Sequence, residues 1–265
     1  MSKPFSLLHD LHCHSILSTC CHDPECTAEA IFKQAREMGY DTLCLADHLW
    51  DADVPGPSSW YAPQDIPHVL SANARDMIPG MRCLLGCETE YCGGGKLGLA
   101  REHFDLFDFV VIPPNHFHMK NFVRPEEIAS ASQVADLFMA RLEEIGQLDI
   151  PHEKVGIAHI TCGLIYREDP PAVFRLLDEK RMRKIFDVFA KKGTGIELNA
   201  FAFSGWVEKP EILRPYEWAK ASGCKFYCSS DAHALKHYAA VGENLPPVVE
   251  ALGLTEEDRY IVPEK

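Results

Sequence analysis

The sequence predicts an α/β protein whose parallel strands close into a barrel. Seven short apolar runs alternate with polar loops and amphipathic segments, and repeated strand–helix units of this kind form a parallel sheet. Nearly every apolar run ends in a histidine, a carboxylate or an asparagine. A barrel collects such groups from all its strands at one rim, whereas an open doubly wound sheet collects them at one switch point. The distribution therefore favours the barrel.

The strands are expected where short apolar runs end in polar residues. In chain order these runs are residues 5–14, 42–47, 82–87, 108–112, 155–158, 195–198 and 225–228. Helices are expected between them, at residues 27–38, 125–146, 171–192 and 208–222. Thr27 is placed to cap the first helix, and Gly39 is placed to end it. The glycine-rich stretch 92–96 lacks the spacing of a nucleotide phosphate loop, so we interpret it as a flexible turn.

Length and composition set limits on the class of protein. The chain has 265 residues, 46% of them hydrophobic, and is expected to form a single domain over residues 1–265. Its formal net charge of −13 disfavours general nucleic-acid binding. The 11 cysteines contain no Cys-x-x-Cys pair, and no apolar run approaches the length of a membrane span. We therefore expect a cytoplasmic location with free thiols and no membrane partner. The oligomeric state is not predicted.

Two short motifs near opposite ends of the chain point to a metal site. The first is His12-Cys13-His14, and the second is Asp231-Ala232-His233. Side chains two apart on an extended strand lie on the same face, so each motif presents two ligand groups together. Satisfied core polar residues do not account for two such pairs at strand ends.

The pieces in between extend the pattern and resemble the PHP family, the polymerase and histidinol phosphatase superfamily. The matching segments are Asp10-Leu-His-Cys-His-Ser, Ala46-Asp-His, Gly86-Cys-Glu, Asn115-His, Ala158-His and Ser230-Asp-Ala-His. The resemblance runs from about residue 9 to residue 237, and stand-alone members of this length resemble histidinol phosphatases. It implies a distorted (β/α)7, TIM-like barrel that holds two or three divalent ions at its C-terminal rim.

The resemblance also implies a ligand set. One ion would be held by His12, His14, Glu88 and Asp231, a second by His22, His48 and His233, and a third by His116 and His159 with Glu88 as a bridge. Imidazoles and a few carboxylates suit zinc, iron or manganese better than calcium or magnesium. Glu88, Asp231 and His233 are the expected catalytic residues.

Alternatives stay open at two ligand positions. His22 lies in a loop, seven residues separate it from His14, and Cys20, Cys21 and Asp23 are nearby substitutes. His116 is preferred over His118 because it follows Asn115 directly, and His118 would then line the substrate cavity. Asp10 and Asp47 lie beside predicted ligands, where they either orient an imidazole or cap a loop.

The expected reaction is hydrolysis of a small phosphate monoester by metal-bound hydroxide, because clustered cations lower the pKa of a bound water and stabilise phosphoryl charge. Histidinol phosphate is the leading named substrate. However, no basic residue follows Glu197-Leu198-Asn199 until Lys209, whereas the family often has one shortly after this strand. Arg167, on a rim loop, and His118 are the expected substrate-binding residues. Other candidate partners for the phosphate are Lys96, Arg101, Lys120 and Arg124.

Two other functions are kept as alternatives: a nucleotide or oligonucleotide phosphodiesterase, and a non-catalytic metal-binding regulatory module. The acidic charge counts against the first, and the complete ligand set counts against the second. Six aromatic residues in the loops after the second and sixth strands either wall the substrate pocket or pack those loops on the barrel. They are Trp50, Trp60, Tyr61, Phe201, Phe203 and Trp206.

Overall fold

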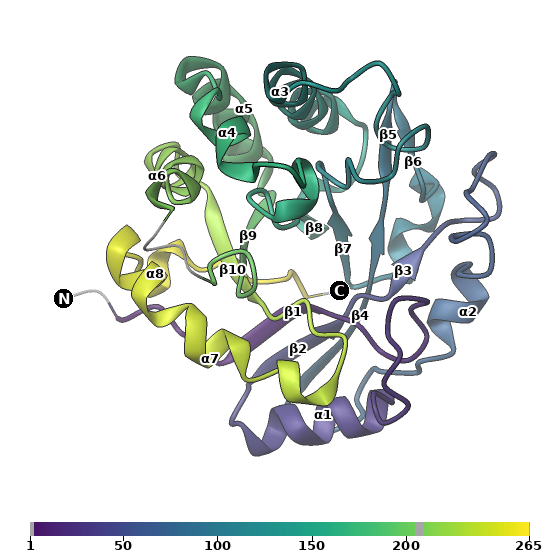
Figure 1. Cartoon of the computed structure of the whole chain (residues 1–265). Coiled ribbons are helices and arrows are strands. Elements are labelled where there is room, and N and C mark those ends of the chain that lie inside the picture. Colours follow the sequence, from purple (N-terminus) through teal and green to yellow (C-terminus); the bar gives the residue numbers. More distant parts are fainter. Residues whose placement is uncertain (1–2, 205–208, 265) are drawn as a thin grey trace.

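Seven parallel strands surround a central axis, and the helices lie outside them (Figure 1). The structure is a computed structural model that describes residues 3–204 and 209–264. The strand order is β1-β2-β4-β7-β8-β9-β10. Each strand in this order is hydrogen-bonded to the next one in parallel. The predicted distorted (β/α)7 barrel is therefore confirmed. None of the described helices is long and apolar enough to cross a membrane.

The strands form at the seven predicted apolar runs. The barrel strands are β1 (His9–Cys13), β2 (Thr42–Leu45), β4 (Arg82–Thr89), β7 (Phe109–Ile112), β8 (Val155–Ile157), β9 (Gly195–Asn199) and β10 (Lys225–Ser229). A short strand, β3 (His48–Leu49), pairs with the end of β4. The glycine-rich stretch 92–96, expected as a turn, contains the turn of a hairpin formed by β5 (Tyr91–Gly93) and β6 (Lys96–Leu97), with positive φ at Gly93, Gly94 and Gly95.

The helices agree with the prediction where capping residues define their ends. They are α1 (Ala28–Glu37), α2 (Ile66–Leu70), α3 (Ala131–Gln147), α4 (Pro170–Arg175), α5 (Glu179–Lys192), α6 (Arg214–Ala221), α7 (Ala240–Asn244) and α8 (Pro246–Leu252). Thr27 caps α1, and Gly39 follows it with φ +83°. The sequence analysis did not predict α2, α7 and α8.

Three predicted helices have different limits. The helix expected from Pro125 begins only after Ser130, whose side chain forms a capping box with Gln133. The helix expected over 171–192 divides into α4 and α5, because Asp178 caps a new helix by accepting a hydrogen bond from the backbone of Arg181. The helix expected over 208–222 is α6, which begins at residue 214. Residue 208 lies outside the described part of the chain.

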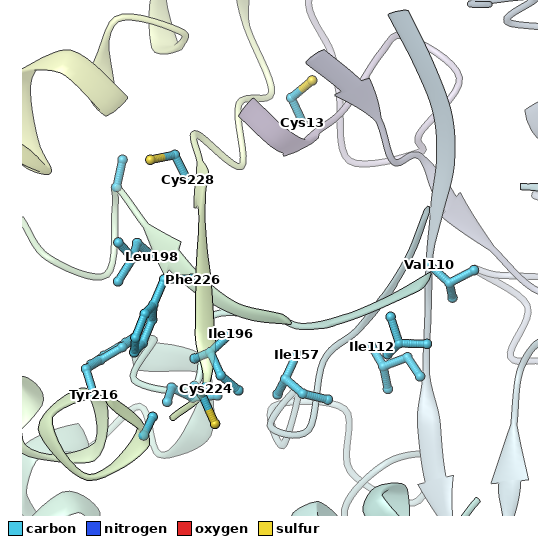
Figure 2. Packing of buried hydrophobic residues seen from close by; sticks show 14 of the residues in the cluster. Cys13, Val110, Ile112, Ile157, Ile196, Leu198, Tyr216, Cys224, Phe226 and Cys228 are labelled. Atoms are coloured by element: carbon cyan, nitrogen blue, oxygen red, sulfur yellow. The ribbon is translucent and has the colours of Figure 1, made fainter. Parts of the chain in front are cut away.

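Alternation along the strands divides the core into two layers. On β7, Phe109 and Val111 belong to an inner cluster inside the barrel, whereas Val110 and Ile112 belong to an outer cluster beneath the helices. Figure 2 shows this outer layer, with Val110, Ile112 and Ile157 pointing away from the ring of strands. Successive side chains on a strand point to opposite faces, so each barrel strand contributes to both layers.

The first and last strands meet along a seam held by polar groups. The backbone N–H of Asp231 donates to the carbonyl of His12 (2.8 Å), and a similar bond joins His14 to Ala232 (3.0 Å). Lower down, Asp10 accepts hydrogen bonds from the backbone and the hydroxyl of Ser230 (3.1 and 2.5 Å). Asp10 therefore holds the seam rather than an imidazole ring.

The C-terminal segment closes the end of the barrel where the strands begin. Tyr260 and Val262 belong to the inner cluster. The backbone of Tyr260 donates to the carbonyl of Phe226 (2.7 Å), and its hydroxyl donates to the carbonyl of Glu153 (2.5 Å). The C-terminal end accordingly lies near the middle of the ring in Figure 1.

Candidate metal centre

At the opposite end of the barrel, where the strands end, the ligand-type side chains surround a cavity of about 320 Å³. The cavity is lined by Cys20, His48, Trp60, Tyr61, Glu88, His116, His118, Met119, His159, Leu164, Asp231 and His233. His12 and His14 lie fully buried beneath it. The strand ends therefore bring together eight of the nine residues predicted as metal ligands.

Glu88 is the centre of this cluster. Its Oε2 atom lies 3.4 Å from Nε2 of His12, 3.5 Å from Nε2 of His14 and 3.0 Å from Nδ1 of His48. Its Oε1 atom lies 3.2 Å from Nε2 of His159. Imidazole nitrogens thus face both oxygens of the Glu88 carboxylate. A carboxylate that bridges two ions needs this arrangement.

At this cavity the ligand atoms fall into three groups, each within 4.8 Å. The groups are His12, His14 and Asp231; His14, Cys20, His48 and His233; and Glu88, His116 and His159. The third group contains His116 and not His118. The second contains Cys20 in the place expected for His22, whose side chain is exposed and does not join any group among the described residues.

Two buried histidines are fixed in the tautomer that a metal ligand needs. Nδ1 of His12 donates to Oε1 of Glu197 (2.7 Å). Nδ1 of His14 donates to the hydroxyl of Ser18 (3.1 Å), which itself donates to Asp47 (2.6 Å). The neutral form of each ring therefore carries its proton on Nδ1 and directs Nε2 at the cluster, which is the role of outer hydrogen-bond partners around metals. Asp47 acts through the loop, not on the imidazole directly.

The same arrangement recurs on the other side of Glu88. Nδ1 of His116 donates to Glu90 in a short contact, and Glu90 also accepts a hydrogen bond from the hydroxyl of Tyr61 (2.6 Å). Nδ1 of His159 donates to Oδ1 of Asn115 (3.1 Å), whose amide group donates to the carbonyl of His159 (2.8 Å). Both rings again present Nε2.

The last strand supplies its ligands from an unusual backbone conformation. Asp231 has φ +49°, and His159, the ligand after β8, has φ +24°. Left-handed conformations of residues other than glycine are uncommon and concentrate at functional sites. Asn199 donates to Oδ2 of Asp231 (3.2 Å), and Nδ1 of His233 donates to the carbonyl of Asp231 (2.8 Å). These contacts leave Oδ1 of Asp231 facing His14 at 3.3 Å.

Charge is balanced inside the buried cluster. Burial by itself favours the neutral acid, but the imidazoles of His48 and His12 outweigh it and hold the pKa of Glu88 well below its usual range. Burial lowers the pKa of His12, yet Glu88 and Glu197 raise it well above its ordinary value. Burial lowers the pKa of His48 well below its ordinary value. A carboxylate that stays ionised among imidazoles is a good ligand for a divalent cation.

Of the two predicted substrate residues, His118 lines the cavity and Arg167 does not. Burial together with His116 and Arg167 lowers the pKa of His118 to about 4. Arg167 itself is exposed. Trp60 and Tyr61 form an aromatic wall beside His48.

The other loop aromatics have different surroundings. Trp50 is buried against Phe122, Phe203 is buried against Tyr216, and Phe201 is exposed beside His237. Trp206 lies outside the described residues.

Sequence reasoning missed the groups that orient the ligands. They are Ser18, Glu90, Asn115 and Glu197, with Cys20 considered only as a substitute for His22. The spacing offered a signal for two of them. Glu90 follows Glu88 by two residues and Glu197 precedes Asn199 by two, so each pair shares one face at a strand end.

These residues fit a cluster of divalent ions. Four of the imidazoles are fixed with Nε2 toward shared carboxylates, and the ligand atoms of each group lie close enough to surround one ion. The donor set of nitrogen, oxygen and one sulfur suits zinc or iron.

Comparison with known proteins agrees with this geometry. The fold is similar to that of histidinol phosphate phosphatase from Lactococcus lactis in complex with zinc, L-histidinol and phosphate, with a TM-score of 0.62 and 14% identity over 96% of this chain and 98% of that chain. A Listeria monocytogenes protein assigned as a histidinol phosphatase gives a TM-score of 0.63 and 14% identity over 87% and 97%. At this identity the likeness concerns the fold. No curated protein sequence matches the chain. The family model for the PHP domain matches residues 10–201, and the chain therefore belongs to the PHP domain family.

Proposed function

We propose that this protein is a metal-dependent phosphoesterase that hydrolyses a small phosphate monoester. The observation that carries the proposal is the set of four histidines whose Nδ1 atoms are all engaged by acceptors, so that their Nε2 atoms converge beneath one cavity. Buried histidines whose other ring nitrogen donates to a fixed acceptor are typical of metal ligands. The PHP family and the histidinol phosphatase fold support the same activity.

The residues proposed to hold two to three zinc, iron or manganese ions are those of the three ligand groups. Bound ions would supply Lewis acidity, which lowers the pKa of a water and neutralises phosphoryl charge. The chain's own part is to hold this array in place. Glu88 joins the groups, Asp231 closes the array from the last strand, and His233 lies at the rim, so we propose these three as the residues closest to the reaction.

The cavity narrows the class of substrate. No lysine or arginine is among the described residues that line it, so the ions are expected to meet the charge of the phosphate. The wall of Trp60, Tyr61, Met119 and Leu164 suits a leaving group with an apolar or aromatic part. Histidinol phosphate, with its imidazole ring, is the first substrate to test, with His118 and Arg167 as proposed substrate contacts.

The test is metal analysis combined with phosphate release on one sample. We expect two to three equivalents of metal, and release from histidinol phosphate or from an aryl phosphate. Release from the aryl ester alone would keep the phosphoesterase and remove the named substrate. Cleavage of oligonucleotides alone would favour the phosphodiesterase. A protein that binds metal but is inert toward all phosphoesters would favour a regulatory module, and a protein that binds no metal would overturn the proposal.

Two further expectations stay predictions. One is the cytoplasmic location, and the other is a single domain over residues 1–265, of which the family model matches residues 10–201. The acidic charge continues to argue against nucleic acid as a partner.

A further inference from the structure

Cys20 lies in the loop between β1 and α1, at the edge of the metal centre. Its sulfur belongs to a group with nitrogen atoms of His14, His48 and His233, all within 4.8 Å. The side chain is partly buried and lines the cavity. His22, two residues later, does not line this cavity but lines a neighbouring groove, which Cys20 and His233 also border.

Anchors on both sides of Cys20 hold the loop against the cluster. Before it, the Ser18 hydroxyl donates to Asp47 (2.6 Å) and accepts from the backbone of His48 (3.1 Å). After it, the thiol of Cys21 donates to the carbonyl of His233 (3.3 Å). The two anchors tie the loop to two elements that carry ligands, so the position of Cys20 is set by the site itself.

We propose that the Cys20 thiolate, and not the His22 imidazole, is the third protein ligand of the ion held by His48 and His233, because Nε2 of His14 faces Asp231 and Glu88 in the neighbouring group. The inference rests on the proposed metal-dependent function and specifies one ligand of that site. As the sulfur–metal bond forms, the thiol proton leaves to solvent. Two imidazoles and one thiolate, with the fourth position left open, make a ligand set of the kind that catalytic zinc takes.

A thiolate at this position has a consequence for the choice of metal. Soft sulfur ligands favour zinc or iron and do not suit manganese or magnesium, which prefer oxygen. An imidazole at the same position would leave manganese competitive. We therefore expect this ion to be zinc or iron and to resist exchange with manganese.

The test uses cobalt(II) as a spectroscopic substitute for zinc. A cysteine ligand gives cobalt(II) a sulfur-to-metal charge-transfer absorption in the near ultraviolet, whereas imidazole and carboxylate ligands do not. The metal-free protein is titrated with cobalt(II) alone, as the wild type and as the Cys20→Ser, His22→Ala and Cys21→Ser variants. Circular dichroism checks that each variant is folded.

We expect the absorption in the wild type and in His22→Ala, and its loss in Cys20→Ser. Folded Cys21→Ser, the matched control, should keep it. Zinc affinity at one site should fall by at least about tenfold in Cys20→Ser, because even loss of an outer partner weakens metal binding by about 10–100-fold. An absorption that survives in Cys20→Ser, or is missing from the wild type, would overturn the inference.

The outcome is separable from that of the proposed function. A wild-type protein that shows the absorption and hydrolyses no phosphoester contradicts the phosphoesterase but supports Cys20 as a ligand. A protein that releases phosphate and lacks the absorption does the reverse.

Discussion

The two ends of the barrel are built from different chemistry. At the end where the strands begin, Tyr260 and Val262 cover an apolar interior. The backbone of Tyr260 donates to the carbonyl of Phe226, and the carbonyl of Val262 accepts a hydrogen bond from the guanidinium of Arg82. At the end where the strands finish, the same interior gives way to imidazoles and carboxylates grouped around Glu88. The difference teaches that one end supplies stability and the other supplies reactivity, which is the usual division in barrels with a rim site.

Strained and unpaired groups lie at the reactive end of the barrel, where the strands finish. Two proposed ligands at the reactive end, His159 and Asp231, have left-handed backbones, and Oε2 of the buried Glu90 has no hydrogen-bond partner among the described residues. Such features cost free energy that the closed end must offset. Changes at the reactive end should therefore alter metal binding, and changes at the closed end should alter unfolding.

The largest expected effect is that of Glu88→Gln. Loss of the shared carboxylate charge removes a ligand from the centre of the cluster, and Lewis acid stabilisation contributes several kcal/mol. We expect at least one equivalent of metal to be lost and phosphate release to fall about a thousandfold or more. Elemental analysis and kinetics on the same preparation measure both. Full metal content with undiminished turnover would contradict the central role of Glu88.

Tyr260→Ala tests the closed end. Tyr260 is 5% exposed, and truncating a buried aromatic residue costs about 3–5 kcal/mol. We expect the free energy of unfolding in urea to fall by that amount while metal stoichiometry is unchanged. Tyr260→Phe is the matched control and should cost about 1 kcal/mol, since it removes only the hydrogen bond to Glu153. Loss of metal from folded Tyr260→Ala would break the division between the two ends.

Glu90→Gln sharpens the picture of the reactive end. Glu90 touches His116 and Tyr61 and does not line the cavity, so it acts by orienting the imidazole. Metal affinity at one site should fall by about 10–100-fold, as measured by competition with a chelator. Glu144→Gln, on a partly exposed carboxylate bonded to Tyr91, should leave affinity unchanged. Equal affinities in the two variants would remove Glu90 from the site.

The smallest effect concerns the pH dependence of unfolding. Burial, with a smaller contribution from Arg259, lowers the pKa of His9 to about 3, and its ring accepts a hydrogen bond from the backbone of Cys228 (2.9 Å). The unfolded state binds the proton more readily, so this stability is complete above pH 6.5 and is lost as the pH falls toward 3. Between pH 6.5 and 5 the wild type should lose about 2 kcal/mol more than His9→Gln. Urea denaturation at both pH values checks the difference, and parallel losses would exclude His9 as the cause.

The sequence was sufficient to predict the strands and most of the residues that the structure groups at the rim, because both follow local rules. Period-2 spacing identified His12 with His14 and Asp231 with His233, and the structure brings all four together. Cys20 could not be chosen over His22 in this way, since a loop has no period and its position depends on Ser18 and Cys21, which bond to residues far along the chain.

The groups that orient the ligands are non-local for the same reason. Glu197 lies 185 residues from His12, and no local pattern links them. Helix limits differed where a cap competed with periodicity, as at Ser130 and Asp178.

The seam between β1 and β10 has a consequence for how the protein is made. His12 and His14 are synthesised before the other barrel strands, but Asp231 and His233 emerge only after the last one. A growing chain folds from its N-terminal side, so for most of its synthesis it holds an incomplete set of ligands. Only a chain that has been translated beyond the final strand can therefore bind the full set of ions. A prematurely terminated product lacks part of the proposed metal centre.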